Sequence, residues 1–342
     1  MLDTLTRLTG LYPAHARPLG PPVPLGNAGG LSGARLWRFD SGSGPMVARA
    51  WPLDGPGPEA LRAIHAWLAR LADLDFIPVP IATLDNRTLI ELDERSWEVA
   101  PWRPGSADVS RPPSPGRLRA AFSALGAVHQ RLAFESTLAP SPGLAARLDE
   151  ASELLASELA QLEAVVRHEA SVGSLEDLGR NFRLSGRTMP DESARFLDAR
   201  VRSAQGGGPD PNPTPGSSIS DPLAEPALRW IALARDGLPS LVAQLRREAS
   251  SAIPLQPVIR DARPAHFLFT GDRLTGLVDF GAMGLESPAA DLARLIGEWI
   301  GPDLAGRSAA LDAYTAVRPI DASEARHIDV FAESGAWLGP AR

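Results

Sequence analysis

The chain has 342 residues, of which 44% are hydrophobic and 22% are charged, and it contains no cysteine. A globular protein of this length has room for two lobes or domains, and the composition excludes a disordered chain, a collagen and a small disulfide-stapled protein. The absence of cysteine excludes thiol catalysis, thiolate metal sites and disulfides, and it favours a reducing compartment.

The charge balance argues against nucleic acid as a partner. The 34 basic residues face 41 acidic ones, which gives a formal net charge of −7, whereas a protein that binds nucleic acid by counterion release carries a positive surface. Every basic residue is an arginine, because the chain has no lysine. A lysine Schiff base and a P-loop are therefore excluded, since both need a lysine side chain.

The N-terminal residues do not read as a secretory signal. Polar residues separate the leucines between Met1 and Thr9, and Asp3 places an acid where a signal has basic residues. No segment approaches 18 uninterrupted apolar residues. The sequence therefore predicts a cytoplasmic protein with no membrane partner.

Residues 25–102 predict a small lobe made mainly of strands. Before it, the proline-rich stretch 1–24 is expected to be a loosely packed lead-in. A helix is predicted over 59–71, because apolar residues recur there at spacings of three and four behind Pro58. Alternating residues predict a hairpin and two later strands, at 34–39, 46–51, 88–92 and 96–100.

Residues 103–342 predict a larger and mostly helical lobe. A segment rich in glycine, proline and serine, 206–222, is predicted to be flexible, because this composition forms neither a helix nor a sheet. Two short strands, 266–269 and 274–278, form a hairpin within the candidate catalytic segment 255–281. Apolar stripes predict helices over 118–132, 144–169, 225–248 and 288–299.

The polar residues of that hairpin carry the chemistry. Asp261 follows a short apolar run, His266 begins the first strand and Asp279 ends the second. A hairpin can bring three such side chains to one end of its strands. Phosphoryl transfer needs this set, because a carboxylate accepts the proton of the hydroxyl while oxygen or nitrogen ligands hold metal ions on the nucleotide phosphates.

These motifs resemble the aminoglycoside phosphotransferase and choline kinase-like family of small-molecule kinases, in the protein-kinase-like superfamily. The family's catalytic segment reads His-Gly-Asp or His-Arg-Asp, then four residues, then Asn, and its metal segment reads Asp-Phe-Gly. This chain reads Ile259-Arg-Asp261, four residues, His266, and then Asp279-Phe-Gly281. The resemblance implies that Asp261 is the catalytic base, that His266 replaces the metal-binding Asn, and that Asp279 is the main Mg²⁺ ligand.

The resemblance extends to the following helix and includes two departures. Pro288-Ala-Ala-Asp291-Leu-Ala is similar to the family's Asp-Pro-x-x-Asp-Leu-Ala, which implies that Asp291 anchors the catalytic loop. Ile259 replaces the family's His, which is expected to reduce the support of the loop and not the reaction. Because imidazole suits softer ions than Mg²⁺, His266 leaves three outcomes open: one Mg²⁺ on Asp279 alone, a preference for Mn²⁺, or weak catalysis.

The small lobe is expected to bind the nucleotide. Gly29, Gly30 and Ser32 resemble the family's glycine-rich loop, whose backbone N–H groups and serine hydroxyl meet phosphate oxygens. Arg49 stands where the family has a lysine on the third strand, and its guanidinium can serve the α- and β-phosphates. The alternatives are an ordinary glycine turn and a surface strand arginine.

Two further assignments depend on position along the chain. Glu59 is the candidate ion-pair partner of Arg49, because it is the only acid near the start of the first predicted helix, and His65 is expected to be a partly buried histidine. The backbone of Glu98 and Ala100 would pair with the edge of adenine at the hinge between the lobes.

Three other polar residues are assigned structural or surface roles. His129 is expected to pack or hydrogen-bond between helices and not to bind a metal. Glu286 and Glu298 are expected on a solvated helix face, with contact to a cationic substrate as the alternative.

Together these patterns predict an α+β fold of the protein-kinase-like type, with a small antiparallel β lobe and a larger helical lobe. The resemblance implies transfer of the γ-phosphoryl group of ATP or GTP, with Mg²⁺ or Mn²⁺, to a hydroxyl of a small-molecule acceptor. The competing interpretation is a pseudokinase, a nucleotide-binding or interaction module without turnover. Ile259, His266 and the missing lysine favour that alternative.

Overall fold

The computed structural model describes residues 2–26, 33–110, 112–172 and 224–339. The chain forms two compact units, the first from residues 1–141 and 252–332 and the second from 142–251 and 333–342. The fold is α+β, as predicted, and its strand pairs are antiparallel. The predicted boundary after residue 102 falls inside the first unit, and that division of the chain stays a prediction.

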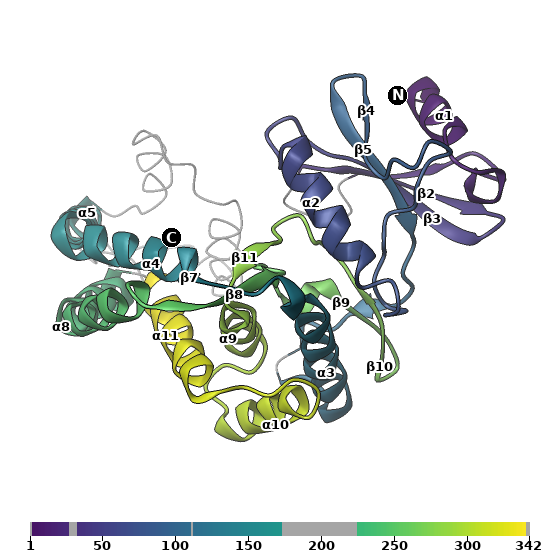
Figure 1. The fold of residues 1–342 in the computed structure, drawn as a ribbon. Helices are drawn as coiled ribbons and strands as arrows, with labels where there is room; N and C mark the ends of the chain where they lie inside the picture. The colour runs from purple at the N-terminus through teal and green to yellow at the C-terminus, as the bar shows by residue number, and fades with distance from the viewer. Residues whose placement is uncertain (1, 27–32, 111, 173–223, 340–342) are drawn as a thin grey trace, which may run out of the picture. The chain divides into compact units, whose positions relative to one another are not determined.

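The first unit holds the strands that the structure describes (Figure 1). Its elements in chain order are α1 (Leu2–Gly10), η1 (Ala14–Ala16), β1 (Val23–Gly26), β2 (Arg35–Ser41), β3 (Gly44–Ala50), α2 (Pro58–Ala69), β4 (Ile90–Leu92), β5 (Arg95–Pro101), β6 (Ser106–Ala107), α3 (Pro115–Leu132), η2 (Ala133–Glu135), β7 (Thr137–Pro140), β8 (Ala252–Val258), η5 (Pro264–His266), β9 (Phe267–Thr270), β10 (Arg273–Leu277), β11 (Gly284–Glu286), α9 (Pro288–Trp299) and α10 (Leu304–Thr315). The second unit holds α4 (Pro142–Glu153), the π-helical η3 (Leu154–Glu158), α5 (Leu159–Val172) and α8 (Ala224–Ala249), and α11 (Ala322–Leu338) runs from the first unit into the second.

A five-stranded sheet forms the N-terminal part of the first unit, in the order β1-β2-β3-β5-β4. Its strands form because buried apolar residues alternate with more exposed ones, as Trp37 and Phe39 do on β2 and Met46 and Ala48 do on β3. The rings of Trp37 and Trp97 stack with their centroids 5.3 Å apart. The predicted hairpin is confirmed as β2 and β3.

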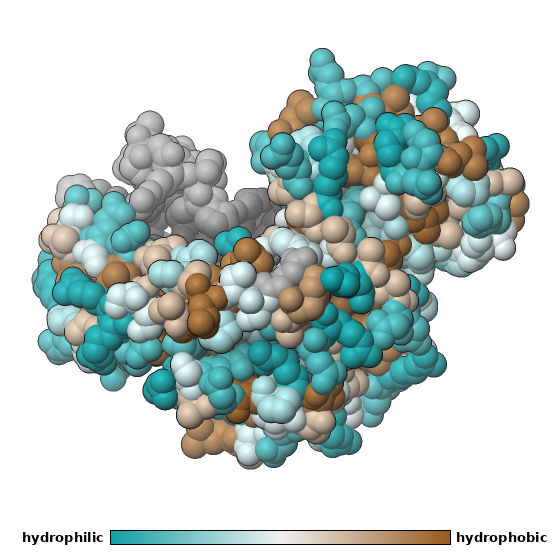
Figure 2. Space-filling model, viewed as in Figure 1, coloured by the Kyte–Doolittle hydropathy of each residue, from teal (hydrophilic) through white to brown (hydrophobic). Residues whose placement is uncertain are grey.

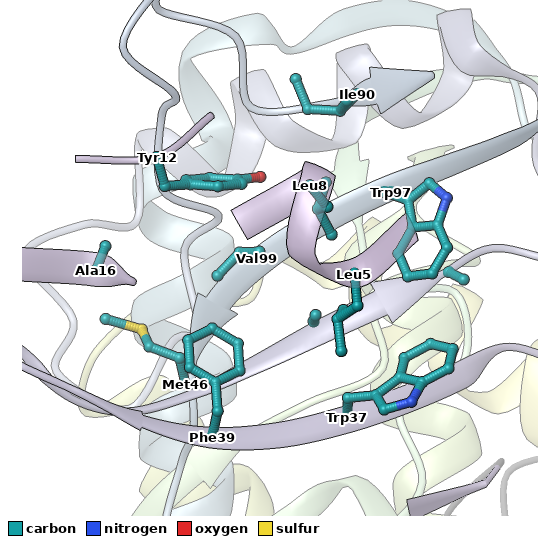
Figure 3. Packing of buried hydrophobic residues seen from close by; sticks show 12 residues of the cluster. Leu5, Leu8, Tyr12, Ala16, Trp37, Phe39, Met46, Ile90, Trp97 and Val99 are labelled. Atoms are coloured by element: carbon teal, nitrogen blue, oxygen red, sulfur yellow. The ribbon is translucent and has the colours of Figure 1, made fainter. Parts of the chain in front are cut away.

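The first residues are not the loosely packed lead-in that was predicted. In α1 and just after it, Leu5, Leu8 and Tyr12 recur at spacings of three and four, and all three are at most 2% exposed. They pack with Phe39 and Val99 of the N-terminal sheet (Figure 3). Burial of each leucine side chain stabilises the folded state by about 1.5–3 kcal/mol. This helix is therefore part of the core, although the segment that contains it is rich in proline.

The segment that carries the candidate chemistry is built from β9, β10 and the helix α9. Strands β9 and β10 form the predicted hairpin, and β6 adds a third strand on the side of β9. Helix α9 begins after Ser287, whose Oγ accepts a hydrogen bond from Ala289 N at 3.3 Å, and Pro288 suits the first turn. The predicted helix over 288–299 is confirmed.

A buried polar chain joins α3, α9 and α10. His129 Nδ1 is 2.8 Å from the hydroxyl of Tyr314, and its Nε2 is 3.1 Å from Asp291 Oδ2. The three side chains are buried. The prediction that His129 hydrogen-bonds between helices is confirmed.

The second unit contains the predicted helices over 144–169, now divided among α4, η3 and α5, and over 225–248, which is α8. Glu163 pairs with Arg167 at 2.7 Å and also with Arg235 of α8. The predicted flexible segment 206–222 lies outside the described residues. Among those that are described, no helix is both long and apolar enough to cross a membrane. Hydrophilic residues cover much of the face in Figure 2, with hydrophobic ones scattered between them.

Candidate active site

The catalytic hairpin brings Asp261, His266 and Asp279 together. His266 Nδ1 lies 2.9 Å from the backbone oxygen of Asp261, and its Nε2 lies 3.6 Å from Asp279 Oδ2. Val278 N donates to the backbone oxygen of His266 at 3.0 Å, which holds the strand that leads to Asp279 beside the histidine. The three residues that the motif spacing singled out therefore form one cluster.

The backbone is left-handed at two positions of this cluster. The φ angle is 64° at Arg260, directly before Asp261, and 65° at Asp279. Residues other than glycine seldom adopt this conformation, which costs about 1–3 kcal/mol and persists only where the surrounding structure imposes it. Such strain collects at functional sites, and here it marks the residue before the expected base and the expected metal ligand itself.

The hydrogen bonding of His266 indicates where a cation would sit. Because a carbonyl oxygen only accepts hydrogen bonds, Nδ1 carries the proton in the contact with Asp261. In the neutral ring, Nε2 then presents a lone pair to the carboxylate of Asp279. These electron-rich atoms repel unless a proton or a metal ion lies between them. Metal-binding histidines typically donate their other N–H to a carbonyl or carboxylate, as His266 does.

The pair of side chains fits one divalent ion. Bonds from such ions to oxygen and imidazole nitrogen are about 2.0–2.2 Å long, so atoms 3.6 Å apart can contact the same ion. Within the described parts of the chain, no group of three or more His, Asp or Glu side chains is placed to hold a metal. His266 and Asp279 would thus supply two ligands, with nucleotide phosphates and water completing the set.

Asp291 of α9 anchors the loop that carries Asp261. Its Oδ2 accepts hydrogen bonds from Ile259 N at 2.8 Å and from His129 Nε2 at 3.1 Å. The side chain of Ile259, which replaces the family's His, is fully buried. The loop is therefore supported at this position by one backbone hydrogen bond and by apolar packing, in agreement with the anchor role that the resemblance implied.

The sequence reasoning missed Arg294, which reaches the expected base. Its Nη2 is 2.8 Å from Asp261 Oδ1, and its Nε is 3.4 Å from Glu298 Oε1. Glu298 also accepts a hydrogen bond from Arg263 Nε at 3.1 Å. The signal that could have found Arg294 is its spacing, since it follows Asp291 by three residues and so lies on the same face of the helix.

The expected solvated helix face is wrong for both glutamates. Glu298 lies on a helix but pairs with two arginines. Glu286 lies on β11 and is 2% exposed, and its Oε1 accepts hydrogen bonds from Ser141 Oγ at 2.6 Å and from Ser287 N at 2.8 Å. Neither presents a carboxylate without a partner to a cationic substrate.

In the N-terminal sheet, Arg49 lies beside the buried carboxylate of Glu98. The two residues are opposite each other on β3 and β5, with Arg49 Nε 3.6 Å from Glu98 Oε1. Glu98 Oε2 is 2.7 Å from His65 Nε2 and 3.2 Å from Trp51 Nε1. The guanidinium carbon of Arg49 also lies 4.8 Å from the centre of the Trp51 ring. These contacts hold the arginine in one place on the sheet.

The expected partner of Arg49 was the wrong glutamate. Burial alone would raise the pKa of Glu98, but the hydrogen bond from His65 and the positive charge of Arg49 outweigh burial and lower it. Glu98 is therefore the ionised partner, whereas Glu59 is exposed. Helix α2 contributes His65, and not a carboxylate, to the cluster around Arg49 and Glu98. This histidine is buried and hydrogen-bonded, as expected.

The backbone of Glu98 and Ala100 does not offer the expected contacts to adenine. Trp51 N donates to Ser96 O, and Trp102 N donates to Pro45 O, both at 2.9 Å, at the two ends of the pairing between β3 and β5. Because backbone hydrogen bonds alternate along a strand with a period of two, the backbone groups of Glu98 and Ala100 also face β3. The sheet uses them, and Glu98 contributes through its side chain.

The remaining predicted nucleotide ligands, Gly29, Gly30 and Ser32, lie outside the described residues, in the connection between β1 and β2. On the catalytic side, Gly281 lies against Trp51. A Cβ atom added to Gly281 would be 2.9 Å from Trp51 Cη2 and 3.0 Å from Cζ3. The tryptophan that supports Arg49 and Glu98 is therefore also in contact with the loop of Asp279.

A kinase-like phosphotransferase is the class that this arrangement defines: an antiparallel sheet with a candidate phosphate-binding cation, then a hairpin with a candidate base and metal ligand. A model of the phosphotransferase enzyme family matches residues 25–322. The chain belongs to this family, which confirms the resemblance and the class of ATP-dependent small-molecule phosphotransferase. No protein with a curated description matches the chain.

Several solved structures are similar to this chain, and the first described here shows the same fold. An aminoglycoside phosphotransferase from Alicyclobacillus acidocaldarius is 17% identical, with a TM-score of 0.53 over 96% of this chain and 82% of that one. A macrolide 2'-phosphotransferase from Brachybacterium faecium is 17% identical, with a TM-score of 0.46 over 99% of this chain and 92% of that one. A putative fructosamine-3-kinase from Thermobifida fusca is 18% identical, with a TM-score of 0.46 and the same coverage.

Proposed function

We propose that this enzyme transfers the γ-phosphoryl group of ATP or GTP to a hydroxyl group of a small molecule, with Asp261 as the catalytic base. The convergence of Asp261, His266 and Asp279 at the end of one hairpin carries this proposal. It combines the proton acceptor and the metal ligands that phosphoryl transfer needs.

In this proposal, the residues near Asp261 act on the acceptor and the metal ion, and those near Arg49 bind the phosphates. Asp261 orients the acceptor hydroxyl and takes its proton. Arg49, fixed by Glu98 and Trp51, binds phosphate oxygens, and the family resemblance implies Gly29, Gly30 and Ser32 as further phosphate ligands. A divalent ion bound by Asp279 and His266 would neutralise charge on the phosphates.

The imidazole of His266 favours Mn²⁺ over Mg²⁺ at that position. Mg²⁺ prefers oxygen ligands, whereas imidazole nitrogen suits later divalent ions. His266 is already oriented by its Nδ1–H contact with Asp261 O, so its Nε2 is pre-positioned for an ion shared with Asp279.

The acceptor is proposed to be a hydroxylated small molecule. Similar structures include enzymes described as aminoglycoside and macrolide phosphotransferases and a putative fructosamine kinase. Aminoglycosides, macrolides and sugar amines are therefore the first acceptors to test, together with choline and homoserine.

The test is a transfer assay with ATP or GTP, Mg²⁺ or Mn²⁺ and this acceptor panel, with phosphorylated product detected by mass spectrometry. Asp261→Asn should abolish transfer, while Asp312→Asn, which changes an exposed residue of α10, should leave it unchanged. Activity retained by Asp261→Asn would show that Asp261 is not the base. Nucleotide binding without any transfer would instead support the pseudokinase interpretation.

A further inference from the structure

One face of α9 contacts every second residue of the loop that carries Asp261. Asp291, Arg294 and Glu298 are spaced by three and four positions, which places them on the same side of the helix. Asp291 contacts Ile259, Arg294 contacts Asp261, and Glu298 contacts Arg263. Alternate residues of the loop thus meet successive turns of the helix in the same order.

The middle contact of this series involves the expected base. Arg294 Nη2 is 2.8 Å from Asp261 Oδ1. This short ion-pair contact falls on Oδ1, and neither carboxylate oxygen accepts a hydrogen bond within the described residues. Both side chains are about one-third exposed, so an acceptor hydroxyl has access to the oxygen that Arg294 leaves open.

Arg294 is itself held in place. Its Nε lies 3.4 Å from Glu298 Oε1, and the other oxygen of Glu298 accepts a hydrogen bond from Arg263 Nε at 3.1 Å. The Nε of Arg294 has no hydrogen-bond partner within the described residues, so its contact with Glu298 is an ion pair. Ion pairs with Glu298 and Asp261 limit the rotation of the arginine side chain, which fixes the position of Asp261 Oδ1.

We propose that Arg294 is a positioning residue for phosphoryl transfer, holding Asp261 through Oδ1 so that Oδ2 faces the acceptor. This inference rests on the proposed function. In the transfer, the acceptor hydroxyl gives its proton to Asp261 Oδ2, a bond forms between the acceptor oxygen and the γ-phosphorus, and the bond from that phosphorus to the β-phosphate oxygen breaks. The products are the phosphorylated acceptor and the nucleoside diphosphate. Arg294 acts on this step through Asp261.

The experiment compares Arg294→Gln, Arg294→Lys and Arg294→Ala with the wild type and with Arg307→Gln. Arg307 is a matched control, because it also pairs with an aspartate, Asp329, and is similarly exposed, but it lies on α10. The measurements are kcat and KM for transfer, the rate of ATP hydrolysis without acceptor, the dissociation constant of ADP, and the melting temperature.

Arg294→Gln should lower kcat about ten- to a hundredfold, the effect of losing one short ion pair that positions a reacting group. The ADP affinity and the melting temperature should stay close to those of Arg307→Gln. Arg294→Lys should recover part of the loss. Millimolar guanidinium should raise the turnover of Arg294→Ala without affecting Arg307→Gln. This rescue separates a positioning role from a purely structural one.

Equal kcat values in Arg294→Gln and Arg307→Gln would overturn the inference and leave the proposed function intact. A loss of kcat in Arg294→Gln that is explained by unfolding, with no rescue of Arg294→Ala by guanidinium, would also overturn it. A wild-type protein that neither hydrolyses ATP nor phosphorylates any acceptor would overturn the proposed function, and this inference with it.

Discussion

Replacing Gly281 with alanine should disturb the loop of Asp279 through the ring of Trp51. The added Cβ would lie 2.9 Å from Trp51 Cη2, well inside the separation of about 3.5–4.0 Å at which carbon atoms attract each other. The ring has little room to move, because Trp51 is 4% exposed and its Nε1 donates to Glu98. Overpacking of this kind costs about 1–3 kcal/mol.

The expected result for Gly281→Ala is a lower melting temperature and weaker nucleotide binding. A domain of about 150–250 residues loses roughly 2–4 °C for each kcal/mol. Nucleotide binding should weaken because the displaced segment carries Asp279. Circular dichroism would report the melting temperature, and calorimetry with ADP and Mn²⁺ would report the binding. The control is Gly297→Ala on α9, where an added Cβ meets nothing within 4 Å, and which should stabilise the helix by up to about 1 kcal/mol.

A double-mutant cycle tests whether the ring is the cause. In a Trp51→Leu background the six-membered ring is gone, so the further change Gly281→Ala should cost little. If Gly281→Ala lowers the stability by the same amount with and without the ring of Trp51, the contact is not the source of the effect, and the reasoning is refuted.

Three further predictions concern the other parts of the structure. Glu98→Gln should weaken ADP binding while the exposed Glu59→Gln does not, as calorimetry would show. The folded-state pKa of Glu98 is lowered, so its ionised form stabilises the fold above the ordinary carboxyl pKa. This contribution is lost as the pH falls through the lowered value. Urea unfolding at several pH values should therefore show that the stability of Glu98→Gln depends less on acid pH than that of the wild type. His266→Asn should shift the preference of the nucleotide complex from Mn²⁺ toward Mg²⁺, measured by Mn²⁺ electron paramagnetic resonance with Mg²⁺ competition, and an unchanged ratio would refute the ligand role. Leu8→Ala should destabilise the protein by about 2–5 kcal/mol, whereas Leu138→Ala, at a position that is 75% exposed, should stay within about 0.5 kcal/mol.

The order of residues along the chain was sufficient to predict that Asp261, His266 and Asp279 lie close together. His266 and Asp279 flank one local hairpin, and Asp261 lies in the loop just before it, so their separation in sequence fixes which end of the strands they share. The helix over 288–299 was equally readable, because its capping serine, proline and apolar stripe are all local signals. Patterns of this kind involve residues close together in sequence, so the local secondary structure alone determines where their side chains lie.

The partners of Arg49 and Asp261 could not be predicted in the same way. The pairing of Arg49 with Glu98 depends on the register of two strands that are 45 or more residues apart, which no local pattern encodes. Arg294 reaches Asp261 only because Asp291 fixes α9 against the catalytic loop. The spacing of the leucines in α1 is a local signal of a buried helix face, and the prolines that follow the helix do not disturb it.

The location of Glu98 bears on how such an enzyme could be controlled. Where the counter-ion of a cationic side chain lies on a helix that can move, an outward movement of that helix breaks the ion pair. Here Arg49 and Glu98 lie on adjacent strands of one sheet. A shift of α2 would therefore remove His65 from Glu98 but would not separate the ion pair. Arg49 therefore keeps Glu98 as its counter-ion whatever the position of α2, and under the proposed function we expect any control of turnover to act elsewhere, such as at the loop of Asp261.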